Sequence, residues 1–365
     1  MTGIKDVARS VGVSTATVSR ALRGLPRVSD ETRVRVLQAA ADMDYVASPS
    51  AAGLASGQTR TIGAIVPFVT RWFYSSVVQG AEEQLREAGY DLLLYNLGGS
   101  HAARERVFRG ALLRKRVDAI LVLSLTPTDD EVAALRTAHR PVAVVGATVP
   151  GWGSVRIDDA ETARIAMRHL LELGHTRIGY IGGSLEDQLD FAAPLDRFAG
   201  YRSALHEADL PARAEWETVG DFTVRGGRAA MCRLMGAQVR PTAVLAASDE
   251  MAIGAVHAVR QAGLRVPEDM SVIGIDDHEM AEFFDLSTVA QPVHAQGRLA
   301  ATLLLDALGA ATNGERPSTS AAALTVPTRL VVRATTAPPR LATTVPVRAP
   351  RPRRVPRTAA SRRTS

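Results

Sequence analysis

The sequence is poor in the features that mark secreted, membrane and metal-binding proteins. It has one cysteine, Cys232, which excludes an internal disulfide and a cysteine-rich metal site. No apolar run approaches the roughly 18–20 residues that span a bilayer. The first ten residues, MTGIKDVARS, lack the apolar core of a secretory signal peptide. These absences predict a cytoplasmic protein with no membrane partner.

Motifs for enzymatic chemistry are also missing. No Walker sequence and no GxGxxG follows a strand-like run, and Gly179, Gly182 and Gly183 are interpreted as a strand end and a turn. No GxSxG nucleophile elbow occurs. The eight histidines are scattered without metal-ligand spacing. We therefore predict no catalytic residues, no metal and no cofactor, because only the α/β fold would support an enzymatic function, and a fold alone does not establish one.

The positive charge is concentrated at the end of the chain. The formal net charge is +5, but eight arginines lie between residues 340 and 363 without any acidic residue, so the rest of the chain is net acidic. Residues 337–365 are rich in Pro, Thr, Ala and Arg, which predicts a disordered tail. Two interpretations stay open for this tail: salt-sensitive, non-specific DNA affinity, or a non-functional extension.

The first 46 residues have the pattern of three short helices. Residues 4–11 carry apolar side chains at helical spacing, and Gly12 interrupts them. Ser14 is a candidate N-cap for a second helix over 15–23, which Gly24 ends. Ser29 is a candidate cap for a third helix that continues to about Ala41. This spacing predicts an all-α head over 1–46 that contains a helix-turn-helix.

The second of these helices is the candidate recognition helix. Its apolar positions face the other helices, which leaves six small or basic side chains for DNA: Ser14, Thr15, Ala16, Thr17, Ser19 and Arg20. Hydroxyl groups reach phosphates or base edges, the methyl of alanine contacts thymine, and arginine donates to guanine. The alternative is a three-helix bundle with an ordinary exposed face.

After a small, polar linker at 47–60, strand-like and helix-like segments alternate. Apolar strand-like runs occur at 61–67, 90–96, 117–124, 141–146, 176–183, 242–248 and 271–277. Strands that are apolar throughout are buried on both faces, and their alternation with helices predicts doubly wound parallel sheets. The roughly 275 residues involved exceed one comfortable sheet, which favours a two-lobed α/β body.

Four pieces of the head stand in the register of a known family: Asp6-Val7-Ala8, Gly12-Val13-Ser14, Thr17-Val18-Ser19-Arg20 and Val28-Ser29. They resemble the DNA-binding head of the lactose/galactose-repressor (LacI/GalR) family. The resemblance implies that Thr15, Ala16 and Arg20 read bases, while Ser14, Thr17 and Ser19 position the backbone. It implies a DNA-binding transcriptional regulator, most often a repressor, that binds a palindromic operator as a homodimer.

The same resemblance implies a hinge helix within 47–60 that forms on the operator. The matching residues are Ala51 and Leu54, the leucine wedging into the minor groove. This sequence departs from the family pattern, because Ala47-Ser48 replaces the usual Pro-Asn and Gly53 lies inside the expected helix. Glycine lowers helix propensity by about 1 kcal/mol, which favours a weaker or more effector-dependent hinge.

The body over 61–336 resembles periplasmic sugar-binding proteins, with two lobes and a ligand cleft between them. One lobe is expected at about 61–159 with 289–321, and the other at about 160–288 with 322–336. The chain is expected to cross between them near 158–160, 287–291 and 321–324. The resemblance implies that a small-molecule effector, a sugar or related metabolite, binds the cleft and changes how the lobes sit.

Eight positions are carried over as effector contacts: Phe73, Tyr74, Arg197, Phe222, Ser248, Asp249, Asp276 and Gln291. Each has a plainer alternative. The two aromatics at the start of a lobe helix also suit the core, Asp249 also suits a helix cap, and Arg197 also suits a surface pair with Asp196 or Asp190.

The residues expected around the cleft differ in charge from those that are usual in the family. Phe68, Arg71 and Trp72 replace the usual Asp and Asn-Pro, and an aspartate frequent after the fourth strand is replaced around Gly146. These changes predict a cleft with fewer acids and an extra cation. They favour an effector that is anionic or less hydroxylated than a hexose. Because residues 337–365 carry no leucine heptad, a dimer is expected rather than a tetramer.

Overall fold

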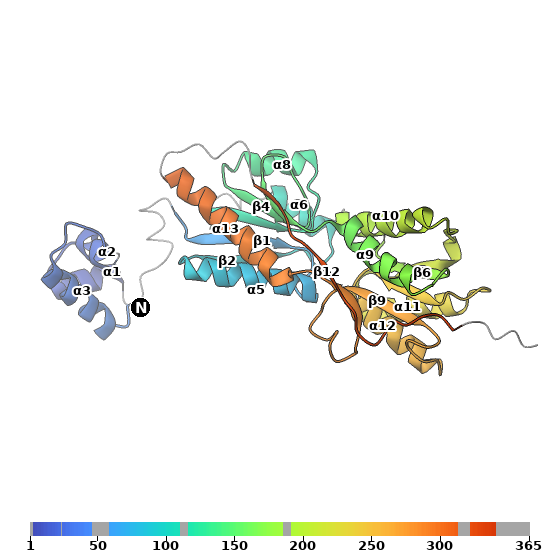
Figure 1. Ribbon diagram of the computed structural model, residues 1–365. Coiled ribbons are helices and arrows are strands. Elements are labelled where there is room, and N and C mark those ends of the chain that lie inside the picture. The colour runs from blue at the N-terminus through green and yellow to red at the C-terminus, as the bar shows by residue number, and fades with distance from the viewer. Residues whose placement is uncertain are drawn as a thin grey trace, which may run out of the picture.

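A computed structural model of the chain describes residues 3–22, 24–45, 58–109, 116–184, 191–312 and 322–340. These residues form a small helical head and a body of two α/β lobes (Figure 1). The predicted fold class, a helix-turn-helix head with a two-lobed α/β body, is confirmed. None of the helices in the described ranges is long and apolar enough to cross a membrane.

The head consists of α1 (Ile4–Val11), α2 (Thr15–Leu22) and α3 (Asp30–Asp42). Gly12 adopts a left-handed conformation with φ of 73°, which allows the tight turn between α1 and α2. Ser29 caps α3 by accepting a hydrogen bond from the Thr32 amide. Seven buried side chains hold the three helices together: Val7, Ala8, Val11, Val18, Ala21, Val36 and Ala40.

The first lobe is built on a six-stranded parallel sheet with the order β11-β5-β4-β3-β1-β2. Its strands are β1 (Thr61–Val66), β2 (Asp91–Asn96), β3 (Ala119–Leu123), β4 (Val142–Val145), β5 (Gly153–Arg156) and β11 (Ala323–Thr325). Its helices are α5 (Trp72–Glu87), α6 (His101–Arg109), α8 (Asp129–Arg136) and α13 (Val293–Thr312).

Alternate residues of these strands pack on opposite faces of the first sheet. Ile62, Ala64 and Val66 pack with side chains of α5 and α13, whereas Ile65 packs with side chains of α6 and α8. A strand buried on both faces has no polar side to expose, which is why the strand-like runs are apolar throughout.

The second lobe has a six-stranded sheet with the order β12-β10-β9-β8-β6-β7, in which only β12 is antiparallel to its neighbour. Its strands are β6 (Ile178–Gly182), β7 (Glu217–Val219), β8 (Ala243–Ala246), β9 (Ser271–Asp276), β10 (Ser287–Ala290) and β12 (Arg329–Val331). Its helices are α9 (Asp159–Glu172), α10 (Ala192–Glu207), the 3-10 turn η1 (Ala214–Trp216), α11 (Val224–Met235) and α12 (Asp249–Gln261).

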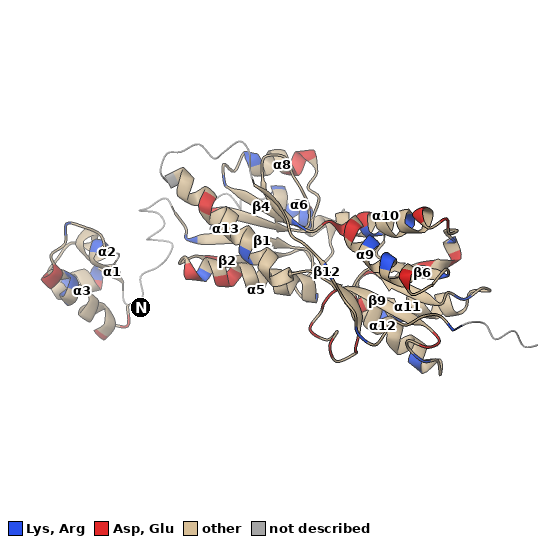
Figure 2. Ribbon diagram, viewed as in Figure 1, with Lys and Arg blue, Asp and Glu red and all other residues tan. Residues whose placement is uncertain are grey.

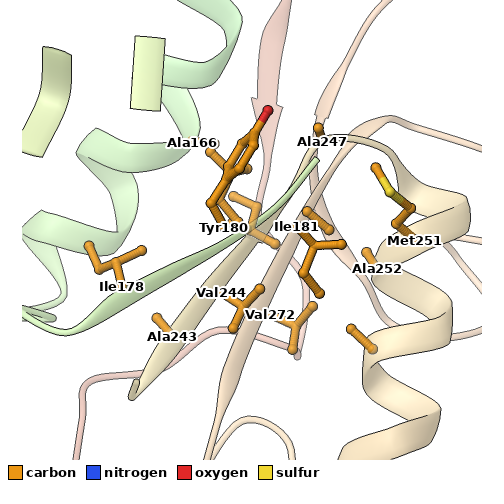
Figure 3. Close-up of a cluster of buried hydrophobic side chains, with 14 of the residues drawn as sticks. Ala166, Ile178, Tyr180, Ile181, Ala243, Val244, Ala247, Met251, Ala252 and Val272 are labelled. Carbon is orange, nitrogen blue, oxygen red and sulfur yellow. The ribbon is translucent and has the colours of Figure 1, made fainter. Parts of the chain in front are cut away.

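The core of the second lobe also uses both faces of its central strands. In β6, Tyr180 and Ile181 point to opposite faces, and Ile181 lies on the side of Met251 and Ala252 of α12 (Figure 3). On the other face, the Tyr180 ring stacks on Tyr201 of α10 with centroids 4.9 Å apart. Residues adjacent in the sequence therefore anchor helices on both sides of the sheet.

The chain passes between the lobes three times, after β5, after β10 and after β11. The third passage was expected at 321–324, which would place residues 322–336 wholly in the second lobe. That expectation is wrong, because Ala323, Leu324 and Thr325 pair with Ser154, Val155 and Arg156 of β5 in the first sheet. The crossing therefore lies at 326–328, between β11 and β12.

The expected start of the disordered tail at 337 is also wrong. Thr335 is buried, and its hydroxyl accepts a hydrogen bond from the Ser287 amide. His175 donates from Nε2 to the Ala337 carbonyl over 2.9 Å, and Arg340 pairs with Asp269 at 2.8 Å. Hydrogen bonds and an ion pair, rather than the burial of apolar side chains, hold this segment on the second lobe. Residues 341–365 lie outside the described part of the chain.

Candidate functional site

The predicted recognition helix presents its side chains outward. Ser14, Thr15, Ala16 and Arg20 are exposed, and Thr17 and Ser19 are half-buried. The Ser14 hydroxyl accepts a hydrogen bond from the Thr17 amide over 3.1 Å and therefore caps α2. These positions suit contacts with a nucleic acid, and their roles in reading DNA stay predictions. Ala51 and Leu54, the predicted hinge contacts, lie outside the described residues.

The arginines of the head divide into two groups. Arg33 donates to the Leu25 carbonyl and Arg35 to the Val11 carbonyl, each over 2.9 Å, so both tie α3 to the other helices. Arg20 is exposed and makes no side-chain hydrogen bond or ion pair with the described residues. Its guanidinium is therefore available to a base or a phosphate.

A cleft lies between the two lobes. Ser124 and Gly146 line it from the ends of β3 and β4, and Ser248 and Asp276 line it from the ends of β8 and β9. All four positions are at or just beyond the carboxyl ends of parallel strands, where open α/β sheets bind their ligands. Acidic and basic positions stand close together where α9 and α10 begin, next to the junction of the lobes (Figure 2).

Seven of the eight predicted effector contacts line this cleft: Phe73, Tyr74, Arg197, Phe222, Ser248, Asp276 and Gln291. The eighth, Asp249, is wrong as a direct contact, because its side chain is fully buried away from the cleft. Its carboxylate accepts from the Thr288 hydroxyl over 2.7 Å and from the His278 amide over 2.8 Å. The helix-cap alternative fails too, since Ser248 is the N-cap of α12.

Arg197 is the centre of a buried polar network on the floor of the cleft. Its Nε donates to the Asp159 carboxylate over 2.7 Å, and its Nη1 donates to the Ala247 carbonyl and lies 3.6 Å from Asp276. This arrangement excludes the surface pair with Asp196. Nη2 has no hydrogen-bond partner among the described residues, so one strong donor is left for a ligand.

Two glutamines continue the network from the second crossover into the first lobe. Gln291 Nε2 donates to Asp276 Oδ1 over 2.6 Å, and Gln296 Nε2 of α13 donates to Gln291 Oε1 over 2.8 Å. Burial raises the pKa of Asp276 to about 6, although Arg197 and Gln291 both lower it. A carboxylate whose pKa is shifted and whose hydrogen-bond partners are fixed, as here in a cleft, is typical of a binding site.

Aromatic side chains form the walls above this polar floor. Phe73 and Tyr74 meet edge-to-face with ring centroids 5.4 Å apart, and Phe191 and Phe222 line the cleft from the second lobe. Outside the lining residues, the Trp72 ring lies 4.6 Å from the His278 ring and connects the lobes. Apolar walls around a few fixed polar groups suit a ring-shaped, partly polar ligand.

Ten residues that line the cleft were not predicted as contacts, among them Asp159, Phe191, Glu250 and Gln296. Asp159 follows the first crossover and could have been suspected from the paired Asp158-Asp159 there. The sequence predicts fewer acids than is usual in the family, and three acids, Asp159, Glu250 and Asp276, line the cleft. The expected extra cation is present, because Arg71 lines the cleft as well.

The described residues of the cleft do not form a metal centre. Within the described ranges, no group of three or more His, Cys, Asp or Glu side chains could hold a metal ion. The polar groups of the cleft are instead paired with one another through the Arg197 network, or face the open space.

Comparisons with known proteins find relatives of both the helical head and the two-lobed body. Residues 3–48 match the family described as bacterial regulatory proteins, lacI family, and residues 167–336 match a periplasmic binding protein-like domain. The HTH-type transcriptional repressor PurR of Vibrio campbellii is 37% identical over 315 residues, covering 84% of this chain and 92% of that protein.

Two solved structures extend the likeness to the whole fold. The lac repressor dimer bound to operator and the anti-inducer ONPF is 26% identical with a TM-score of 0.80, covering 92% of this chain and 99% of that one. The transcriptional regulator CelR in complex with cellobiose is 32% identical with a TM-score of 0.67, covering 92% and 100%. The relatives are transcriptional repressors rather than enzymes, and this chain belongs to the lacI family of bacterial DNA-binding regulators.

Proposed function

We propose that this protein represses transcription by binding a palindromic operator as a homodimer, and that a carbohydrate in the cleft switches it. The observation that carries the proposal is the buried network of Asp159, Arg197, Asp276, Gln291 and Gln296. It draws its members from both lobes and the crossover between them. A ligand bound to it therefore favours one arrangement of the lobes over another.

A hydroxylated effector fits this cleft better than an anionic one. Three carboxylates and two arginines line it, so the cleft has no excess of positive charge to hold an added negative one. Hydroxyl groups donate to the carboxylates and accept from the free Nη2 of Arg197. The cellobiose bound to the related CelR supports a carbohydrate. The three carboxylates of the cleft argue against the anionic or less hydroxylated effector that the sequence alone favours.

Dimerisation is supported by apolar surface on the second lobe. Phe283 has 79% of its surface exposed and Met280 has 39%, both in the loop between β9 and β10. Large exposed apolar side chains close together mark interaction surfaces. A two-fold dimer places two heads on two half-sites, and the lac repressor neighbour was solved as a dimer on its operator.

In the head, we propose that Thr15, Ala16 and Arg20 read bases, while Ser14, Thr17 and Ser19 position the backbone. All are exposed or half-buried, five of them on α2 and Ser14 at its N-cap. Ala51 and Leu54 are the corresponding contacts of the hinge. The small side chains at 15 and 16 leave Arg20 as the long donor, so it should contribute most to base discrimination.

The test combines operator selection with ligand screening. The operator is selected from a random DNA pool, and its affinity is measured by fluorescence anisotropy with and without a panel of mono- and disaccharides. We expect a palindromic site and at least one carbohydrate that changes operator affinity about 5-fold or more. A protein that selects a site but responds to no carbohydrate, in affinity or in thermal stability, would contradict the effector assignment.

A further inference from the structure

Glu250 and Arg71 are two charged residues of the cleft that the network does not use. Glu250 lies in the first turn of α12 in the second lobe, and Arg71 directly precedes α5 in the first. Both line the cleft and both are half-buried. They approach it from different elements than Arg197, which lies on α10.

Neither side chain has a polar partner in the described part of the protein. No hydrogen bond and no ion pair within 4 Å involves the Glu250 carboxylate there, and the Arg71 guanidinium only stacks on the Phe68 ring, 3.9 Å from its centroid. By contrast, the neighbouring Asp249 is fully satisfied. A half-buried carboxylate without a partner destabilises the folded state, so its retention in a cleft needs a reason.

The electrostatic surroundings of Glu250 agree with this geometry. Burial and the negative charge of Asp276 on β9 together raise the pKa of Glu250 to about 7, although Arg71 from the opposite lobe lowers it. The carboxylate therefore titrates near neutral pH and is sensitive to any group placed beside it.

We propose that Glu250 and Arg71 form a second polar subsite of the effector cleft, which binds a neutral, hydroxyl-bearing part of the ligand. A hydroxyl donates to the carboxylate and accepts from the guanidinium at once. When both residues are ionised, their charges cancel, so neither an anionic nor a cationic substituent is favoured there. This inference rests on the proposed function and adds the residues that set effector specificity.

The subsite also predicts a proton-linked affinity. For a ligand that requires ionised Glu250, this residue alone weakens binding about tenfold at pH 6 relative to pH 8, because its ionised fraction falls from about nine-tenths to about one-tenth. Glu250→Gln removes this dependence and leaves the change of about twofold that Asp276 contributes, given that its pKa is about 6.

The experiment compares wild type, Glu250→Gln, Arg71→Met and the control Glu268→Gln, an exposed glutamate of the same lobe. Binding of ribose, glucose, cellobiose, glucosamine and glucuronate is measured by calorimetry at pH 6 and pH 8. We expect the best neutral ligand to bind Glu250→Gln and Arg71→Met about 10- to 100-fold more weakly than wild type at pH 8. Glu268→Gln should bind normally, and the charged sugars should bind less well than glucose.

A second measurement needs no ligand. Because folding raises the pKa of Glu250, its charge destabilises the folded state as pH rises. Glu250→Gln should therefore have a higher Tm than wild type at pH 8, with a difference that shrinks toward pH 5. Equal Tm values at pH 8, or unchanged neutral-sugar affinity in Glu250→Gln, would overturn the subsite alone. No binding of any sugar to wild type would overturn the carbohydrate effector and the subsite together.

Discussion

Replacing Arg197 with methionine gives the most demanding test of the cleft. Methionine keeps an apolar stem but removes the guanidinium that faces both Asp159 and Asp276. The two carboxylates are 8% and 9% exposed, so water cannot replace the lost charge. Removing one partner of a buried ion pair costs about 3–5 kcal/mol of unfolding free energy, and we expect a loss in this range at pH 8.

The pH dependence of this loss has a defined sign. Burial already raises the pKa of Asp276 to about 6, and loss of Arg197 removes a charge that lowers it. In the variant, Asp276 therefore stays protonated to higher pH, and the folded state binds more protons than the unfolded one. Stability then falls more steeply from pH 5 to pH 8 than in wild type, by about 1.4 kcal/mol for each tenfold rise in proton affinity.

The assay is urea unfolding followed by tryptophan fluorescence and circular dichroism at pH 5 and pH 8. Arg202→Met on the same helix is the matched control, because its pair with Glu217 leaves 43% of the Arg202 side chain exposed. A pair with one partner this exposed is partly screened by solvent, so its loss should cost less than that of the buried Arg197 pairs. An Arg197→Met variant that loses no more than Arg202→Met, or whose loss is independent of pH, would refute the account of the network.

Three further predictions concern the helices and the DNA. Gly297→Ala should destabilise the protein by about 1–3 kcal/mol, because its new Cβ would overlap the Val77 carbonyl of α5; unfolding that matches wild type would contradict this. Arg20→Ala should weaken binding to the selected operator by about 1–3 kcal/mol and relax discrimination among bases at one position of that operator. An equal loss of affinity for all DNA sequences would instead indicate a phosphate contact. Deleting residues 341–365 should flatten the salt dependence of DNA binding if their arginines contact phosphates, as read from anisotropy titrations between 50 and 200 mM salt, roughly the range over which such contacts show.

Local sequence signals were sufficient where one short segment decides the structure. Gly12, Ser14 and Ser29 predicted the turn and caps of the head because each acts on its own backbone neighbours. The apolar runs predicted the strands because burial on both faces needs no knowledge of partners. Residues at strand ends, such as Asp276, fell in the cleft because parallel strands align their carboxyl ends.

Sequence patterns did not predict the structure where the direction of a side chain, or the pairing of a strand, depends on a distant element. Asp249 and Glu250 are adjacent acids, but successive helical residues point about 100° apart. The sheet that α12 packs against decides which one reaches the cleft, and it buries Asp249. Arg197 likewise pairs with Asp159, 38 residues away. The placement of β11 in the first sheet depends on β5, which no pattern in three residues can specify.

The two helices that carry cleft residues of the first lobe, α5 and α13, pack so closely that they are expected to move together. Phe73 lies at the start of α5 and Gln296 near the start of α13, and the two helices pack side by side on one face of the first sheet (Figure 1). A Cβ at Gly80 or Gly297 would overlap the backbone of the other helix, so their axes are in close contact. A ligand that shifts either residue must therefore move both helices together. The aromatic contacts of Trp72 with His278 and of Phe68 with Phe191, rather than the α5–α13 interface, join the two lobes and are expected to change with their arrangement.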